Sequence, residues 1–222
     1  YKYNATLKTK KGLLAKEVTD NGYASLLTPT AGSYQELSQI VNQKLKHPIH
    51  LSFGSPLNYD EMLALVLYTS SSEICKDVRA SEQNEDYLKW KHFRVNIANA
   101  VYKLPSVAKN TFDGSGMLYY GFSKVCGDDA YNGWWQSASI LSTSIDRDVA
   151  TEHVKKEGCV LEFPLMDTFG KTFETADVSW ISAFPDEQEV IVLPNREFYA
   201  QYLGVEHMAD DKKLHLYRIK TE

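Results

Sequence analysis

The chain has 222 residues, of which 43% are apolar, and a formal net charge of −5. This length and composition allow one large domain, or a domain with a small subdomain, around a substantial core. No run of about 18 uncharged apolar residues occurs, which excludes a membrane span. Acids and bases are interspersed along the chain, which argues against a nucleic-acid-binding face.

The N-terminal segment 1–16 lacks the apolar stretch of a signal peptide, and a chain that begins with Tyr1 is expected to be part of a longer protein. Three cysteines, Cys75, Cys126 and Cys159, have neither metal-ligand nor CxxC spacing and are expected to be buried or incidental thiols. The histidines show no joint ligand spacing, so no metal site is predicted.

The first part of the chain is predicted to be helical. Ser33 and Glu36 have the spacing of a capping box, as do Asn58 and Glu61, and apolar residues follow each pair at helical intervals. A third helix is predicted from an apolar stripe formed by Trp90, Phe93, Ile97, Val101 and Leu104. These patterns predict a helical N-terminal lobe over residues 1–105.

Beyond Pro105 the sequence is typical of β-strands. The short runs are rich in β-branched and aromatic residues, and they cover 117–123, 137–144, 159–164, 189–194, 197–203 and 214–220. One predicted helix, 146–157, interrupts them. The pattern predicts an α+β fold in which the helical lobe packs on a β-rich core spanning residues 106–222.

Two acidic residues lie at the start of one predicted strand. Glu189 begins the strand 189–194, and Glu187 ends the long segment 170–187, a candidate binding loop. Residues two apart in a strand point to the same side. The pair is therefore either a solvated strand edge or a set of carboxylates that stabilises a developing cation or accepts a proton.

Three hydroxyl residues, Ser142, Thr143 and Ser144, end the strand that precedes the predicted helix. Ser144 is expected at the helix N-cap, where its oxygen can accept a hydrogen bond from a backbone N–H. On their own these residues are ordinary cap and turn residues.

Together with the acid pair, they resemble the arginine, serine, glutamate-x-glutamate class of ADP-ribosyltransferases, which includes vertebrate ecto-enzymes and many bacterial toxins and effectors. The resemblance covers roughly residues 55–220. Segments 64–79 and 93–105 resemble the helical lobe of that family, 142–150 its serine strand and following helix, and 187–194 its glutamate strand.

The resemblance implies a two-sheet mixed β core that binds NAD as a substrate and transfers ADP-ribose to a protein side chain. Glu189 would be the catalytic glutamate, which contacts the nicotinamide ribose. Glu187 would activate the acceptor, and a glutamate here favours arginine. Ser142 would position Glu189. The cofactor-binding residues would be Tyr120, Gly121, Ser142, Thr143, Ser144 and Trp135.

The implied partner is a target protein, with Phe173 and Trp180 as candidate contacts. Of Trp134 and Trp135, one ring is expected in the core and the other over the cofactor cleft. A secreted or host-delivered effector is favoured over a resident cytoplasmic protein.

One position departs from the family pattern. Tyr120 stands where the first core strand of the family carries an arginine that approaches the phosphates of the cofactor. A tyrosine cannot supply the charged, multidentate fork of an arginine. Three hypotheses follow: an active transferase in which Arg147 or Lys124 compensates, a degenerate fold kept as a protein-binding or NAD-sensing module, or a related chemistry such as NAD hydrolysis or transfer to a different acceptor.

Overall fold

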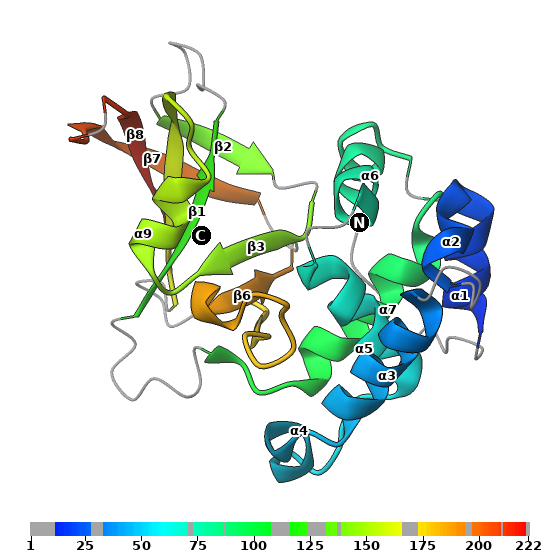
Figure 1. The fold of residues 1–222 in the computed structure, drawn as a ribbon. Coiled ribbons are helices and arrows are strands. Elements are labelled where there is room, and N and C mark those ends of the chain that lie inside the picture. Colours follow the sequence, from blue (N-terminus) through cyan, green and yellow to red (C-terminus); the bar gives the residue numbers. More distant parts are fainter. Residues whose placement is uncertain are drawn as a thin grey trace. The chain divides into compact units, whose positions relative to one another are not determined.

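A computed structural model of the chain describes residues 12–27, 33–70, 73–86, 88–107, 116–123, 132–136, 139–165, 173–193, 197–209 and 211–220 (Figure 1). The chain forms two compact units. The helical unit comprises Tyr1–Pro105 and Trp180–Pro185, and the strand unit comprises Ser106–Ser179 and Asp186–Glu222. No helix in the described ranges has both the length and the apolar character needed to cross a membrane.

The helical unit is built from seven α-helices in its described residues. They are α1 (Leu13–Val18), α2 (Ala24–Leu27), α3 (Ser33–Leu45), α4 (Pro48–Ser52), α5 (Tyr59–Thr69), α6 (Glu73–Gln83) and α7 (Lys91–Lys103). A π-helical turn, η1 (Thr19–Tyr23), joins α1 to α2, and Gly22 adopts φ 93° there, a conformation that glycine tolerates best.

The three helices predicted from the sequence are present as α3, α5 and α7. Asn58 accepts a hydrogen bond from the Glu61 backbone N–H at 2.9 Å, and Glu61 accepts one from the Asn58 N–H at 2.9 Å, so the capping box of α5 is confirmed. The predicted apolar stripe of α7 is buried along its whole length, from Trp90 to Leu104. Burial of this stripe supplies most of the stabilisation of α7.

Two carboxylates hold α7 in the helical unit. Both Glu17 oxygens, from α1, accept hydrogen bonds from the free N–H groups of His92 and Phe93 at 2.9 and 2.7 Å. Burial raises the pKa of Glu17, and the two backbone hydrogen bonds oppose that shift. At the other end, Lys103 donates to both oxygens of the buried Glu61 at 2.7 and 2.8 Å.

The strand unit contains eight described strands and one α-helix. They are β1 (Met117–Phe122), β2 (Asn132–Gln136), β3 (Leu141–Ser144), α9 (Arg147–Glu152), β4 (Glu157–Pro164), β5 (Thr175–Asp177), β6 (Glu189–Val192), β7 (Glu197–His207) and β8 (Lys213–Lys220). All strands belong to one mixed sheet in the order β2-β7-β8-β4-β1-β3-β6-β5. The α+β fold class is confirmed, and the expected pair of sheets is one continuous sheet.

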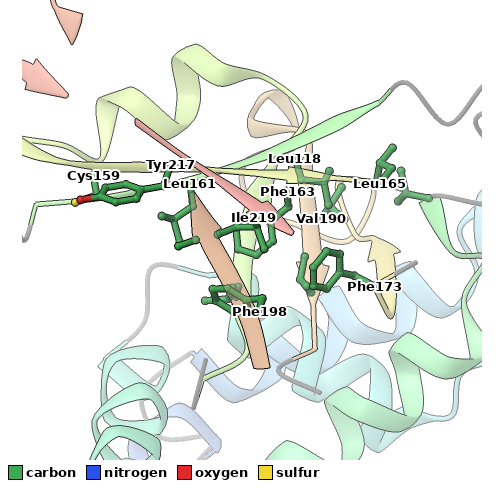
Figure 2. Packing of buried hydrophobic residues seen from close by; sticks show 14 residues of the cluster. Leu118, Cys159, Leu161, Phe163, Leu165, Phe173, Val190, Phe198, Tyr217 and Ile219 are labelled. Carbon is green, nitrogen blue, oxygen red and sulfur yellow. The ribbon is translucent and has the colours of Figure 1, made fainter. Parts of the chain in front are cut away.

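The main core cluster of the strand unit lies on one face of this sheet (Figure 2), and a smaller cluster of Val154, Val160 and Leu214 lies on the other. Val190 of β6 and Phe198 of β7 belong to the same buried main cluster, although four other strands lie between β6 and β7 in the sheet. The sheet must therefore curl around this cluster. Within it, the Phe163 ring meets the rings of Phe173 and Phe198 edge-on, with centroids 5.6 and 5.8 Å apart.

Helix α9 covers part of the other face, against β1 and β3. It is shorter than the predicted helix, because the chain turns after Glu152 and Glu157 already belongs to β4. The Ser123 hydroxyl fixes this turn by donating to the His153 carbonyl at 3.0 Å and accepting from the Lys155 N–H at 2.9 Å.

Two strands were not predicted from the sequence. β2 falls in the tryptophan segment, and the short β5 lies within the expected loop 170–187. The predicted strand 137–144 begins only at Leu141; residues 137–138 lie outside the described residues.

Candidate functional site

Two of the candidate catalytic residues, Ser142 and Glu189, lie on the neighbouring strands β3 and β6 (Figure 1). The antiparallel register sets Ser144 opposite Glu189 and Ser142 opposite Ile191. The Ser142 hydroxyl donates to Glu189 Oε1 at 2.5 Å. The Glu189 side chain is only 4% exposed, so the structure brings these two predicted site residues together and holds the carboxylate in one orientation.

Glu187 is positioned through its backbone. It ends a 3₁₀ turn, η4 (Pro185–Glu187), and Gln188 has φ 47°, so the two acids are not alternating residues of one strand as expected. Ser144 donates to the Glu187 carbonyl oxygen at 2.7 Å. In the described part of the chain, the partly buried Glu187 carboxylate has no recorded partner.

Ser144 is not the N-cap of α9, which corrects the prediction. The N-cap is Asp146, whose carboxylate accepts from the Asp148 N–H at 2.9 Å. Ser144 is the last residue of β3, and its hydroxyl is already engaged with the Glu187 carbonyl and the Asp146 N–H. Thr143 faces the core and donates to the Val190 carbonyl at 2.7 Å, so it braces the two strands.

Gly121 lies on the sheet face that carries Ser142 and Glu189. A Cβ atom there would lie 1.8 Å from the backbone oxygen of Ala150 in α9. Glycine at this position therefore allows α9 to approach β1.

Tyr120 points to the opposite face. Its strand neighbour Tyr119 pairs with Ser144, which puts Tyr119 on the face of Glu189 and Tyr120 on the other. The Tyr120 ring packs against the core cluster, and its centroid lies 5.6 Å from the centroid of the Phe122 ring. The structure does not bring the Tyr120 side chain to Ser142 and Glu189.

The remaining predicted residues lie elsewhere. Trp135 is in β2, which five strands separate from β6 in the sheet, and its side chain lies outside the described residues, as does all of Lys124. Trp134 is half exposed. Phe173 is buried in the core.

The aromatic residue left exposed before Glu187 is Phe184, at 44% exposed. Trp180 is instead buried in the helical unit, where its ring stacks on His47 and His50 and Lys44 donates to its carbonyl oxygen at 2.7 Å. The sequence analysis missed Phe184, although its place three residues before Glu187 was a usable signal.

Chemically, the site offers a buried carboxylate with one oxygen held by a serine hydroxyl. A fixed anion of this kind stabilises positive charge that develops beside it. No group of three His, Cys, Asp or Glu side chains in the described ranges is placed to hold a metal ion.

Comparison with solved structures identifies the fold. A form of the type III effector XopAI from Xanthomonas axonopodis pv. citri with a 70-residue N-terminal truncation superposes with a TM-score of 0.59 at 13% identity, covering 98% of this chain and 92% of that chain. The ADP-ribosyltransferase HopU1 of Pseudomonas syringae pv. Tomato DC3000 gives 0.58 at 13% identity, over 82% of this chain and 87% of HopU1.

Exoenzyme S from Pseudomonas aeruginosa, solved with human 14-3-3 protein beta and carba-NAD, gives a TM-score of 0.50 at 15% identity, over 82% of this chain and 88% of that enzyme. No family model and no curated protein matches the sequence. The chain therefore has the fold of ADP-ribosyltransferases.

Proposed function

We propose that this protein is an NAD-dependent mono-ADP-ribosyltransferase that modifies a protein side chain and releases nicotinamide. The observation that carries the proposal is the buried Glu189, held by the Ser142 hydroxyl at 2.5 Å, on a fold shared with ADP-ribosyltransferases. The NAD analogue bound to exoenzyme S supports NAD as the substrate.

In the proposed reaction the bond between nicotinamide and C1′ of the ribose breaks, and nicotinamide leaves with the bonding electron pair. Positive charge develops on the ribose, and the Glu189 carboxylate stabilises it. The Ser142 hydroxyl keeps the carboxylate in place. A nucleophilic atom of the acceptor then bonds to C1′.

Glu187 is proposed to act on the acceptor. Its partly buried carboxylate has no recorded partner in the described ranges, and its backbone is fixed to Ser144. It would accept the proton that an arginine guanidinium loses as its nitrogen attacks C1′. The exposed Phe184 is proposed to contact the target protein, in place of the buried Phe173 and Trp180.

Delivery into a host cell, or secretion, is proposed for this protein. The support is the likeness to XopAI, a type III effector, and to exoenzyme S in complex with a human protein.

Incubation of the protein with a cell lysate and NAD labelled in the adenylate tests the proposal. We expect label in a lysate protein and matching release of nicotinamide. Glu187→Gln is expected to reduce labelling far more than nicotinamide release, because water can still attack C1′. Equal losses would refute the acceptor role of Glu187, and release without labelling in the wild-type protein would indicate an NAD glycohydrolase.

A non-catalytic binding module is the second candidate. The observation that favours it is the Tyr120 side chain, which packs against the core rather than beside Glu189. By the sequence resemblance, Tyr120 occupies the position of the family arginine. Folded protein that neither binds nor cleaves NAD would support this alternative.

A further inference from the structure

A row of paired residues crosses the sheet face that carries Glu189. Each residue is the direct partner of the next on the adjacent strand, so all of them lie on the same face. The row runs from β6 to β2 through Glu189, Ser144, Tyr119, Glu162, Arg218, Gln201 and Asn132. Every member can form hydrogen bonds.

The row lies on the face opposite the main core cluster, because the neighbours of its members in each strand point the other way, and within the row Tyr119 packs against the smaller cluster of Val154, Val160 and Leu214. Leu118, Leu161 and Val190 belong to the core cluster on the opposite face. Burial also changes along the row, from Glu189, which is almost fully buried, to Asn132, which is exposed. The row therefore leads from the buried carboxylate towards solvent.

A fixed cation lies in the row. Arg218 donates from Nε and Nη2 to Glu162 Oε2 at 3.0 and 2.6 Å. The Glu162 side chain is 12% exposed and that of Arg218 is 45% exposed. No partner of Nη1 is recorded in the described ranges, so the carboxylate orients a guanidinium that still has donors to offer.

A second arginine lies close to the same carboxylate. Arg147, at the start of α9, pairs with Glu206 through Nη1 and Nη2. The pKa of Arg147 is raised mainly by the Glu206 hydrogen bond, with smaller contributions from the charges of Glu162 and Tyr119.

We propose that Arg218, oriented by Glu162, binds the diphosphate of NAD and so supplies the cation that Tyr120 cannot. This inference rests on the proposed function. A diphosphate carries two negative charges, and the planar guanidinium fork matches its oxygens. Arg218 would contact the substrate, and Glu162 would be a positioning residue.

The spacing along the row suits a dinucleotide. The Arg218 guanidinium is hydrogen-bonded to Glu162, whose strand β4 is three strand spacings from β6, the strand of Glu189. Three strand spacings amount to about 14 Å along the sheet. An NAD molecule with its nicotinamide ribose at Glu189 can therefore extend its diphosphate along the row to Arg218.

Binding of three probes to the whole chain tests the proposal: NAD, ADP, which has the diphosphate without nicotinamide, and nicotinamide riboside, which has no phosphate. We expect Arg218→Gln to weaken NAD and ADP binding by about 10- to 100-fold, the effect of one charge-assisted hydrogen bond. Binding of nicotinamide riboside should not change. Arg218→Lys, which keeps the charge but not the fork, should give an intermediate loss.

Lys213→Gln is the matched control. It removes one positive charge from the same strand, β8, but Lys213 lies on the opposite face, where it pairs with Glu157 at 2.6 Å. The NAD affinity of Lys213→Gln should equal that of the wild-type protein. Equal losses in both variants would overturn the proposal in favour of a general charge effect.

The double variant Arg218→Gln/Glu162→Gln separates binding from stability, because the single change leaves Glu162 without its cation. The double variant should unfold at the same urea concentration as the wild-type protein yet still bind ADP weakly. Wild-type affinity for NAD in a folded Arg218 variant would overturn the role of Arg218 and leave the proposed function intact. A folded wild-type chain that binds neither NAD nor ADP would overturn both.

Discussion

Glu189→Gln removes one charge and almost no volume from the candidate site. Glutamine still offers an oxygen to the Ser142 hydroxyl, which donates to Glu189 Oε1 at 2.5 Å. The hydrogen bond and the strand pairing should therefore survive, and the urea midpoint should change little. The variant isolates the effect of the charge.

The expected loss of rate follows from the burial of Glu189, which is 4% exposed. A carboxylate about 4 Å from a full positive charge, at an effective dielectric constant of about 20, contributes about 4 kcal/mol. If this energy acts on the transition state alone, nicotinamide release should fall by about 10³-fold.

The assay is the initial rate of nicotinamide release at saturating NAD, with circular dichroism to confirm folding. Glu157→Gln, which neutralises a carboxylate of β4 that pairs with Lys213, serves as the control and should retain the wild-type rate. A Glu189→Gln rate within about threefold of wild type, in folded protein, would refute the electrostatic role, because it corresponds to less than about 1 kcal/mol.

Three further outcomes are expected. Gly121→Ala should destabilise the protein by about 3 kcal/mol or more in urea titrations, because the new Cβ meets the α9 backbone. The control Gly133→Ala, whose new Cβ meets nothing within 4 Å, should change the free energy of unfolding by less than about 1 kcal/mol. Similar values for the two variants would contradict the close approach of α9. Ser142→Ala should lower nicotinamide release by about 10- to 100-fold, because Glu189 loses a charge-assisted hydrogen bond, and an unchanged rate would show that the hydroxyl does not position the carboxylate. Hydrogen bonds from His215, and to a smaller extent from Lys213, lower the pKa of Glu157 below its usual value of 4.5, so the stability that Glu157 contributes is present above pH 4.5 and is lost as the pH falls through its folded pKa. The urea midpoint of the wild-type protein should therefore drop more steeply below pH 4.5 than that of Glu157→Gln. Parallel curves for the two proteins would contradict this.

Local signals in the sequence predicted much of the helical unit. The Asn58–Glu61 capping box and the apolar stripe of α7 depend on residues close together in the chain, and both are present. The capping of α7 by Glu17 was not predictable in this way, because 75 residues separate Glu17 from His92. Contacts at such separation follow from packing rather than from local pattern.

At the candidate site, residue types predicted more than residue orientation did. Ser142 and Glu189 meet as expected, since adjacent strands bring them together. The alternation rule failed for Glu187, because a 3₁₀ turn and the left-handed Gln188 precede β6. Tyr120 could be assigned to a strand but not to a face, because a shift of one residue in strand register reverses every side chain.

Strand order was the other feature that the sequence left open. Arg218 lies on the last strand of the chain, far in sequence from Glu189, and only the pairing of β8 with β4 brings it onto the same face as the candidate site. A cation contributed by a different strand cannot be found by matching a motif along one strand.

The stoichiometry of NAD consumption tests the central claim most directly. The wild-type protein would be incubated with a cell lysate and NAD labelled separately in the nicotinamide and in the adenylate. The transferase account predicts that each nicotinamide released is matched by one adenylate label bound covalently to protein. Release of nicotinamide with the adenylate label left in free ADP-ribose, or no release from folded protein, would contradict it.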